Sequence, residues 1–224
     1  MTETFSQDHP QGPAVRGFLH RPAVPSRAGL ALCHGAGGNC GAPLLVALAE
    51  AFCEAGITVL RFDLPYRQAK RFGPPSPGSA ATDREGIRRA AAALKKLAPG
   101  RICFGGLSYG GRQTTMLAAE DRAVADGLLL LSYPLHPPGR PEQLRTAHLP
   151  NLKAPALFVH GTKDPFGAIE EMRAALTLIP AAISLAVVEG AGHDLGYGRK
   201  ASSRAQVDLP QTVLAAFRNL FDLS

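Results

Sequence analysis

The chain has 224 residues, of which 46% are hydrophobic and 19% are charged, and its formal net charge is +6. A chain of this size can bury the core of one large domain, and this composition excludes extensive disorder. The basic residues are scattered and accompany no recognition helix or RNA-stacking motif, which argues against a nucleic-acid partner.

Short apolar runs alternate with longer helical patterns along almost the whole chain, and no internal repeat or second domain interrupts them. This alternation indicates the α/β class, with a mostly parallel sheet covered by helices on both faces. The first strand is expected at residues 30–33, and later strands at 58–62, 101–104, 128–131, 156–160 and 184–188. We therefore predict a single domain over residues 1–224.

Local signals mark where the helices begin and end. In chain order they are a start at Pro43, an end at Gly56, and the capping-box pairs Thr82 with Glu85 and Asp208 with Gln211. Further helical patterns occupy residues 113–120 and 168–179.

Two connections are longer than simple connectors need to be. One follows Asp63 and reaches Ser79, and the other occupies residues 132–153. The second is rich in Pro, His and Arg, and we expect it to be a short cap-like insertion that leaves the pocket open. Its His136 and His148 are either surface polar residues or rim the pocket, and we name both as candidate substrate-binding residues.

The first ten residues carry no cationic patch followed by an apolar segment, and no apolar run is long enough to cross a membrane. The four cysteines lack zinc-site spacing and are few for a disulfide framework in a chain this long. They are Cys33, Cys40, Cys53 and Cys103. We expect a cytoplasmic protein with reduced cysteines and no membrane partner.

Residues 106–110, Gly-Leu-Ser-Tyr-Gly, fit the G-x-S-x-G pattern of a nucleophile elbow. They lie between an apolar strand and a helix, which is the context that this turn requires. Small flanking residues let the strand and helix approach closely while the serine Oγ projects above the sheet. The pattern predicts Ser108 as a nucleophile, which needs a base and an orienting acid elsewhere.

Both partners follow in the chain order Ser, Asp, His that this kind of site uses. The strand at 156–160 leads into Asp164, and the strand at 184–188 leads into His193. Asp164 would fix the imidazole tautomer, and His193 would accept the serine proton and return it to the leaving group. The sequence therefore predicts a triad of Ser108, His193 and Asp164.

Two other aspartates could supply the acid of the triad, and Asp164 could have a structural role instead. Asp63 precedes the serine in the chain, and Asp194 directly follows the histidine, so neither fits as well as Asp164. Asp164 has a further reading as the cap of the helix expected near Gly167, and the two roles can coexist.

An oxyanion hole in such a site uses the amide after the nucleophile and another from the loop after an earlier strand. Here these are the amide of Tyr109 and the glycine-rich turn at 34–41, in which Ala36 is the preferred donor and Gly37 the alternate. His34 is expected to pack and form hydrogen bonds beneath this turn. Because Cys40 stands where a third glycine belongs, the turn does not fit a dinucleotide-binding fingerprint.

At these motifs the chain resembles the α/β-hydrolase superfamily and, within it, proteins similar to testis-expressed protein 30 and NSL complex regulatory subunit 3. The blocks that carry the resemblance are HGAGG at 34–38, RFDLPYR at 61–67, GLSYGGR at 106–112, YPLHPPG at 133–139 and HGTKDPFG at 160–167. The resemblance implies the fold and the triad, and it supplies no substrate. Some members of this group act in complexes rather than as enzymes.

The sequence thus favours a carboxylesterase-like serine hydrolase that cleaves an ester, thioester or related acyl bond through an acyl-enzyme. Its partner would be a small-molecule acyl substrate, and neither a metal nor an organic cofactor is needed. The alternative is a non-enzymatic interaction protein that retains the hydrolase scaffold. Arg67, Lys70 and Arg71 are expected to be solvated; facing the site, they would favour an anionic substrate.

Overall fold

The computed structural model describes residues 1–26, 28–98, 100–198 and 203–222. Within these ranges one sheet of eight strands has the order β1-β2-β4-β3-β5-β6-β7-β8. The strands are β1 Thr2–Gln7, β2 Val15–His20, β3 Ala28–Cys33, β4 Thr58–Phe62, β5 Arg101–Leu107, β6 Gly127–Leu131, β7 Ala156–Gly161 and β8 Ile183–Val188. Strands β3 to β8 are parallel to one another, while β2 is antiparallel to both of its neighbours, β4 and the edge strand β1.

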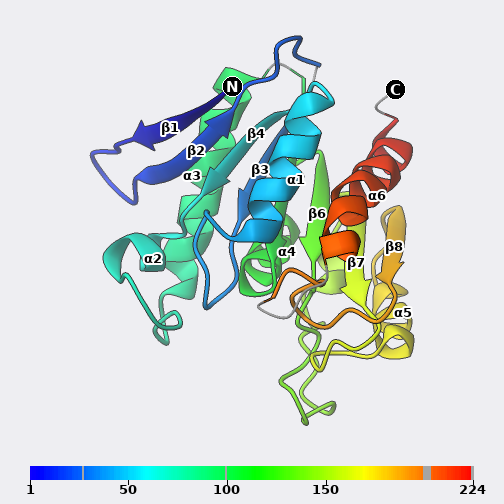
Figure 1. Cartoon of the computed structure of the whole chain (residues 1–224). Coiled ribbons are helices and arrows are strands. Elements are labelled where there is room, and N and C mark those ends of the chain that lie inside the picture. The colour runs from blue at the N-terminus through cyan, green and yellow to red at the C-terminus, as the bar shows by residue number, and fades with distance from the viewer. Residues whose placement is uncertain (27, 99, 199–202, 223–224) are drawn as a thin grey trace.

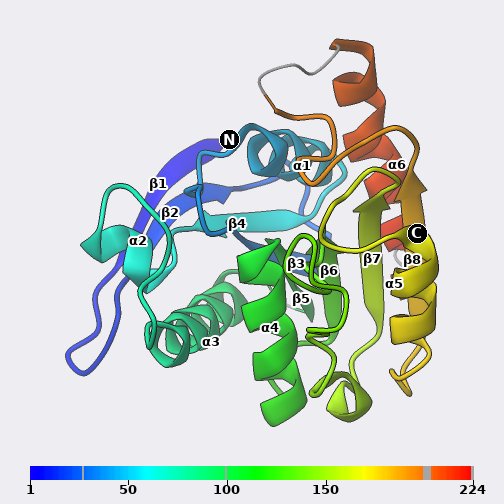
Figure 2. The same cartoon turned by 90° about the horizontal axis from the view of Figure 1, so that it is seen from below.

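Helices cover both faces of this sheet (Figures 1 and 2). They are α1 Pro43–Glu54, α2 Pro65–Ala69, α3 Ala80–Leu97, α4 Tyr109–Glu120, α5 Ile169–Leu176 and α6 Ser203–Phe221, together with the 3₁₀ turn Leu149–Asn151. Helices α1 and α6 lie on one face, and α3, α4 and α5 lie on the other. The predicted α/β class with a mostly parallel sheet is confirmed.

Alternating side chains of the central strands divide the core into two layers. In β6, Leu128 and Leu130 pack on the face covered by α3 and α4, whereas Leu129 and Leu131 pack on the face of α1 and α6. Both faces of such a strand are buried, because each is covered by helices. The resulting rigid sheet brings its connecting loops together at the carboxyl ends of β3 to β8.

The antiparallel pair β1–β2 was not predicted, since the first strand was expected at residues 30–33. Strand β1 reads Thr-Glu-Thr-Phe-Ser-Gln, and most of its residues are exposed. A polar edge strand has no alternation of apolar side chains, so only its pairing with β2 defines it.

Both predicted capping boxes are wrong. Helix α3 begins at Ala80, so Thr82 and Glu85 lie inside it, and the Glu85 carboxylate instead accepts hydrogen bonds from Arg88 and Arg89 at 2.7 and 2.8 Å. Likewise α6 begins at Ser203, upstream of Asp208 and Gln211. Side-chain pairs at this spacing also occur in the middle of helices, where they stabilise the helix along its exposed side and do not cap its end.

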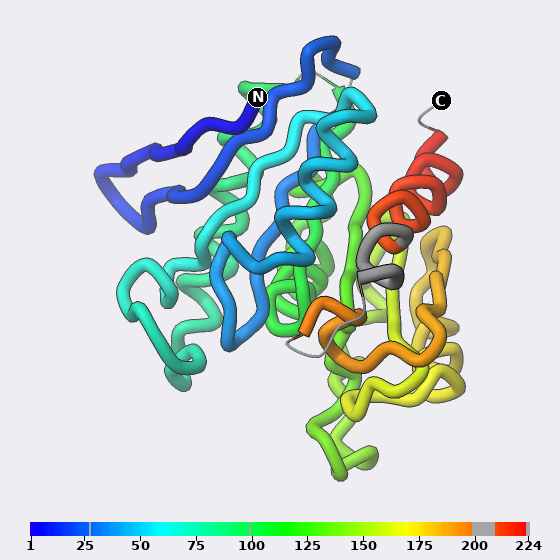
Figure 3. Tube along the Cα trace, in the orientation of Figure 1, coloured from blue at the N-terminus to red at the C-terminus, as the bar shows by residue number. Residues whose placement is uncertain are grey.

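The segment 132–153 projects from the end of the molecule that also carries the 34–41 turn (Figure 3). It contains the 3₁₀ turn Leu149–Asn151 and packs against α4. Among the described residues no helix is long and apolar enough to cross a membrane.

Candidate active site

Ser108 lies at the tight turn between β5 and α4. Its backbone has φ 52° and ψ −113°, a left-handed conformation that costs a residue with a side chain on the order of 1–3 kcal/mol. A Cβ at Gly106 would lie 2.5 Å from the amide nitrogen of Gly111, and one at Gly110 would lie 2.5 Å from the carbonyl oxygen of His34. The flanking glycines therefore allow the close packing that holds the strained serine in place.

Three side chains from separate loops form a hydrogen-bonded chain. The Oγ of Ser108 lies 2.8 Å from Nε2 of His193, and Nδ1 of His193 lies 2.8 and 3.0 Å from the two carboxylate oxygens of Asp164. An ionised carboxylate only accepts hydrogen bonds, so the imidazole proton lies on Nδ1 and the Nε2 lone pair faces Ser108. This is the tautomer that a general base needs.

Asp164 and His193 are held in place by their neighbours. Asp164 is 5% exposed, and its Oδ1 also accepts a hydrogen bond of 2.9 Å from the amide of Phe166. The Phe166 ring stacks on the His193 ring with a centroid separation of 4.1 Å. Helix α5 is capped instead by Glu171, which accepts the Ala168 amide at 2.7 Å, so Asp164 does not cap it.

The glycine-rich turn after β3 is fixed from behind by hydrogen bonds to its carbonyl groups. The Tyr66 hydroxyl lies 3.0 Å from the Gly35 oxygen and 2.9 Å from the Ala36 oxygen, and Arg67 Nε donates to the Gly38 oxygen at 2.7 Å. In a trans peptide the N–H points opposite to the preceding C=O. The Ala36 and Gly37 amides therefore point away from Tyr66.

Two buried side chains complete this support. His34 is fully buried, and its Nε2 accepts the Leu64 amide at 3.1 Å, so Nδ1 donates to the Gly35 oxygen at 2.9 Å. Burial lowers the pKa of His34 and keeps the ring neutral. Asp83 is also fully buried and accepts hydrogen bonds from the Tyr66 amide at 3.0 Å and the Tyr109 hydroxyl at 2.7 Å.

A cavity of about 580 Å³ lies over Ser108 and His193. The other residues that line it are Gly35, Ala36, Gly37, Gly38, Ala42, Leu107, Pro165, Phe166, Gly192 and Asp194. The wall is mainly apolar, and Asp194 adds one carboxylate to it. Such a cavity suits an uncharged acyl group beside a few polar groups that act on it.

The predicted site residues divide into two groups. Ser108, Ala36, Gly37 and His193 line the cavity, while Asp164 and Tyr109 directly adjoin lining residues. The other two predicted residues do not line it: His136 Nε2 lies 3.3 Å from Glu171 Oε2, and His148 Nε2 lies 2.8 Å from Thr115 Oγ1. These contacts fasten segment 132–153 to α5 and α4, so the expected substrate-binding role has no contact to support it.

The expectation that Arg67 is solvated is wrong. Its side chain is buried beneath the 34–41 turn, whereas Lys70 and Arg71 are exposed. Sequence reasoning also missed Tyr66, Asp83 and Phe166 as parts of this region. Tyr66 and Phe166 lie within the blocks 61–67 and 160–167, and Asp83 carried no local signal, because only folding brings it next to Tyr66.

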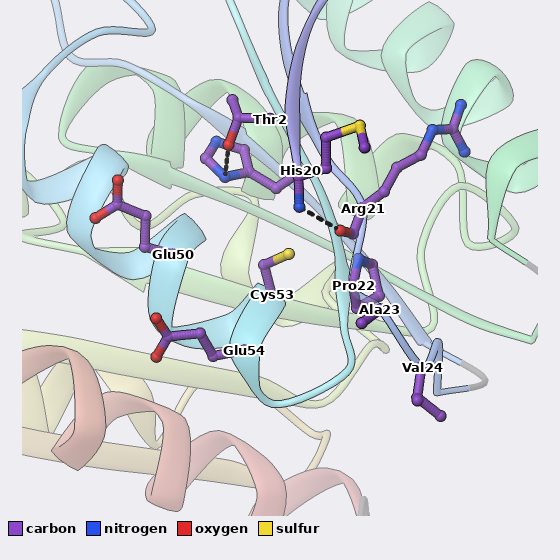
Figure 4. Close-up of a pocket in the computed structure, with 10 residues that line it drawn as sticks. Thr2, His20, Arg21, Pro22, Ala23, Val24, Glu50, Cys53 and Glu54 are labelled. Carbon is purple, nitrogen blue, oxygen red and sulfur yellow. Dashed lines mark hydrogen bonds between the residues drawn. The ribbon is translucent and has the colours of Figure 1, made fainter.

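A second cavity, of about 420 Å³, lies beside β1, β2 and α1 (Figure 4). Its lining residues include His20, Cys53 and Glu50, so it offers an imidazole, a nucleophilic atom and a carboxylate, as the predicted triad does. However, His20 Nε2 accepts a hydrogen bond from Arg61 Nε at 2.9 Å, and burial raises the pKa of the Cys53 thiol. No relay comparable to that at Ser108 is present among the described contacts of this cavity.

An eight-stranded, mostly parallel sheet with a nucleophile elbow after β5 defines the α/β-hydrolase class. The family model for the alpha/beta hydrolase domain matches residues 26–221, and the chain belongs to this family.

Solved structures with the same fold include a dienelactone hydrolase from Anabaena variabilis, with a TM-score of 0.76, 20% identity and 98% coverage of each chain. An alpha-beta serine hydrolase homologue from Coxiella burnetii has a TM-score of 0.73 and 18% identity, with 96% of each chain covered. A serine hydrolase without a lid from Xanthomonas campestris has the same TM-score and identity, with 97% of this chain and 94% of that chain covered. At these identities the likeness shows the fold.

Proposed function

We propose that this α/β hydrolase is a carboxylesterase-like serine hydrolase that cleaves an ester, thioester or related acyl bond. The observation that carries the proposal is the hydrogen-bonded chain from Ser108 through His193 to Asp164, with 2.8 Å at each of its two links. The resemblance to proteins similar to testis-expressed protein 30 and NSL complex regulatory subunit 3 supports the same triad.

In the proposed reaction, Ser108 Oγ attacks the acyl carbon while His193 Nε2 accepts its proton. The negative charge on the carbonyl oxygen is stabilised by the amide of Tyr109 and by that of Ala36 or Gly37. His193 then donates the proton to the leaving alcohol or thiol, which gives an acyl-enzyme. A water molecule, deprotonated by the same imidazole, releases the acid and restores Ser108.

The substrate is proposed to be a small molecule whose acyl group fits the apolar wall near Leu107 and Phe166. Because Phe166 stacks on His193, an acyl group bound there would also shield the imidazole from water. Segment 132–153 contributes no residue to the described lining, so the cavity should admit substrates without movement of that segment.

Reaction with a fluorophosphonate probe, followed by mass mapping of the labelled residue, tests this function directly. Ser108 should be labelled, and Ser108→Ala should abolish labelling and the turnover of short 4-nitrophenyl esters. Ser132→Ala is a matched control, because Ser132 also follows a strand and has a positive φ of 47°, but it is buried outside the cavity. A folded wild-type protein without labelling or turnover would instead support the non-enzymatic scaffold.

A further inference from the structure

A cationic cavity of about 530 Å³ lies at the same edge of the sheet as the proposed active site. The residues that line it are Arg16, Asn39, Asp63, Arg67, Gln68 and Arg71. Three guanidinium groups thus face one carboxylate, in contrast to the apolar wall around Ser108. Guanidinium groups are the side chains that best match the geometry of carboxylate and phosphate groups.

The 34–41 turn borders both this cavity and the catalytic cavity. Gly38 lines the catalytic cavity, and the next residue, Asn39, lines the cationic one. Arg67 contacts the turn from the cationic side, with Nε 2.7 Å from the Gly38 oxygen and an Nη atom 3.3 Å from the Ala36 oxygen. A substrate that extends past this turn from Ser108 would therefore reach the guanidinium groups.

The described partners of the Arg67 guanidinium are all neutral groups. It donates hydrogen bonds to the carbonyl oxygens of Ala36, Gly38, Lys70 and Gly73, and its guanidinium carbon lies 5.1 Å from the centroid of the Tyr66 ring, so these partners carry no formal negative charge. Its side chain is only 7% exposed. A buried charge is stable when an opposite charge offsets its lost hydration, and a bound anion in this cavity would supply one.

The other charged groups leave room for such an anion. Arg71 is exposed, and its guanidinium carbon lies 5.3 Å from the centroid of the Phe72 ring. Arg16 pairs with the exposed Asp8. One carboxylate oxygen of Asp63 is occupied by the Cys40 amide at 2.7 Å. The lining therefore keeps a net positive charge.

We propose that this cavity is a subsite for an anionic group, a carboxylate or a phosphate, carried by the substrate of the proposed hydrolase. The inference rests on the proposed function, and it specifies how the substrate is oriented in the two cavities. The uncharged acyl bond lies at Ser108, and the anionic end lies beyond the turn against Arg16 and Arg71. Asp194, which lines the catalytic cavity, repels an anion from that side.

Two esters of equal chain length test the subsite: 4-nitrophenyl hexanoate, which is neutral, and the 4-nitrophenyl monoester of adipic acid, which ends in a carboxylate. Arg16→Gln and Arg71→Gln should each raise KM for the adipate ester about tenfold and leave KM for the hexanoate ester unchanged, because one charged hydrogen bond is lost. Arg122→Gln removes the same charge from an exposed position between α4 and β6, at the opposite edge of the sheet, and should change neither KM.

Inhibition by inorganic phosphate shows whether the anion is part of the substrate or binds as a free ion. Phosphate that competes with the adipate ester and leaves the hexanoate ester unaffected supports a substrate subsite; equal inhibition of both esters indicates a free-anion site and overturns the proposal. Unchanged KM values in both arginine variants also overturn it. If neither ester is hydrolysed, the proposed function fails. Calorimetry of phosphate binding to Ser108→Ala, with and without Arg71→Gln, then tests the subsite separately. Phosphate binding that is lost with Arg71→Gln supports the subsite, and binding that is absent or unaltered overturns it.

Discussion

Two cavities of this molecule each contain a histidine and a side chain with a nucleophilic atom, but their chemistry differs. The cavity at the carboxyl ends of the strands contains Ser108 and His193, with Asp164 hydrogen-bonded to the histidine, while the cavity beside β1, β2 and α1 includes Cys53 and His20 (Figure 4). Each therefore offers a nucleophilic atom and an imidazole. The difference between them shows what besides residue type a site requires.

The two histidines differ in their hydrogen-bond partners. His193 Nε2 faces Ser108 Oγ at 2.8 Å, with an acid behind it, whereas His20 Nε2 faces the Arg61 guanidinium at 2.9 Å. Burial and, second, the charge of Arg61 lower the pKa of His20 to about 4. An imidazole whose lone pair already accepts a hydrogen bond from a cation is a poor general base. Backbone position and partners therefore distinguish the sites.

The largest expected effect is the loss of the nucleophile. Ser108→Ala should lower kcat on short acyl esters by on the order of a thousandfold or more and leave folding nearly intact, because the turn accepts a small side chain. Cys53→Ala, made in the other cavity, should leave kcat unchanged. Steady-state kinetics with circular dichroism of both variants measures the contrast, and equal activity of Ser108→Ala and wild type would refute it.

A second test compares the carboxylate behind His193 with a carboxylate of the other cavity. Asp164→Asn should reduce kcat by roughly a hundredfold to ten-thousandfold, since an amide no longer fixes the Nδ1–H tautomer, and KM should change little. Glu50→Gln in the other cavity serves as the control and should have no effect. An active Asp164→Asn enzyme would exclude Asp164 as the orienting acid.

A smaller effect is expected behind the 34–41 turn. Tyr66→Phe removes the hydroxyl that binds the Gly35 and Ala36 oxygens, so the amides of the turn should be less well aligned and kcat should fall about tenfold at unchanged KM. Tyr133→Phe loses a comparable bond, of 2.7 Å to the Arg145 oxygen, away from the cavity. If both variants show the same kinetics, Tyr66 does not position the turn.

The smallest expected effect is on the pH dependence of stability, and it concerns His20, the histidine of the other cavity. The folded-state pKa of His20 is about 4, below its ordinary 6.5, so folding favours the neutral ring. The unfolded state then binds the extra proton between pH 6.5 and 4, and stability is present above that window and lost as the pH falls through it.

For His20→Gln, the loss of unfolding free energy between pH 7 and 4.5 should be smaller than in wild type by on the order of 1–2 kcal/mol. Urea denaturation at the two pH values measures this difference, and activity at pH 7 should be unaltered. Identical pH dependence of wild type and variant would show that His20 is not held neutral.

Much of the fold and the arrangement around Ser108 could be predicted because the signals are local. Buried strands appear as continuous apolar runs, and G-x-S-x-G records the backbone demands of one turn. Asp164 and His193 each follow a strand by a few residues, and neighbouring parallel strands end at the same edge. Sequence order therefore predicted which side chains meet there, and the structure brings them within 3.0 Å.

Tertiary structure alone decided the environment of these side chains. The polar strand β1 is defined by pairing with β2, and Arg67 is buried because the 34–41 turn folds over it. His136 and His148 are directed to α5 and α4 by contacts with Glu171 and Thr115. Such contacts join residues distant in the chain, and neither periodicity nor motif spacing records them, because both describe only near neighbours along the backbone.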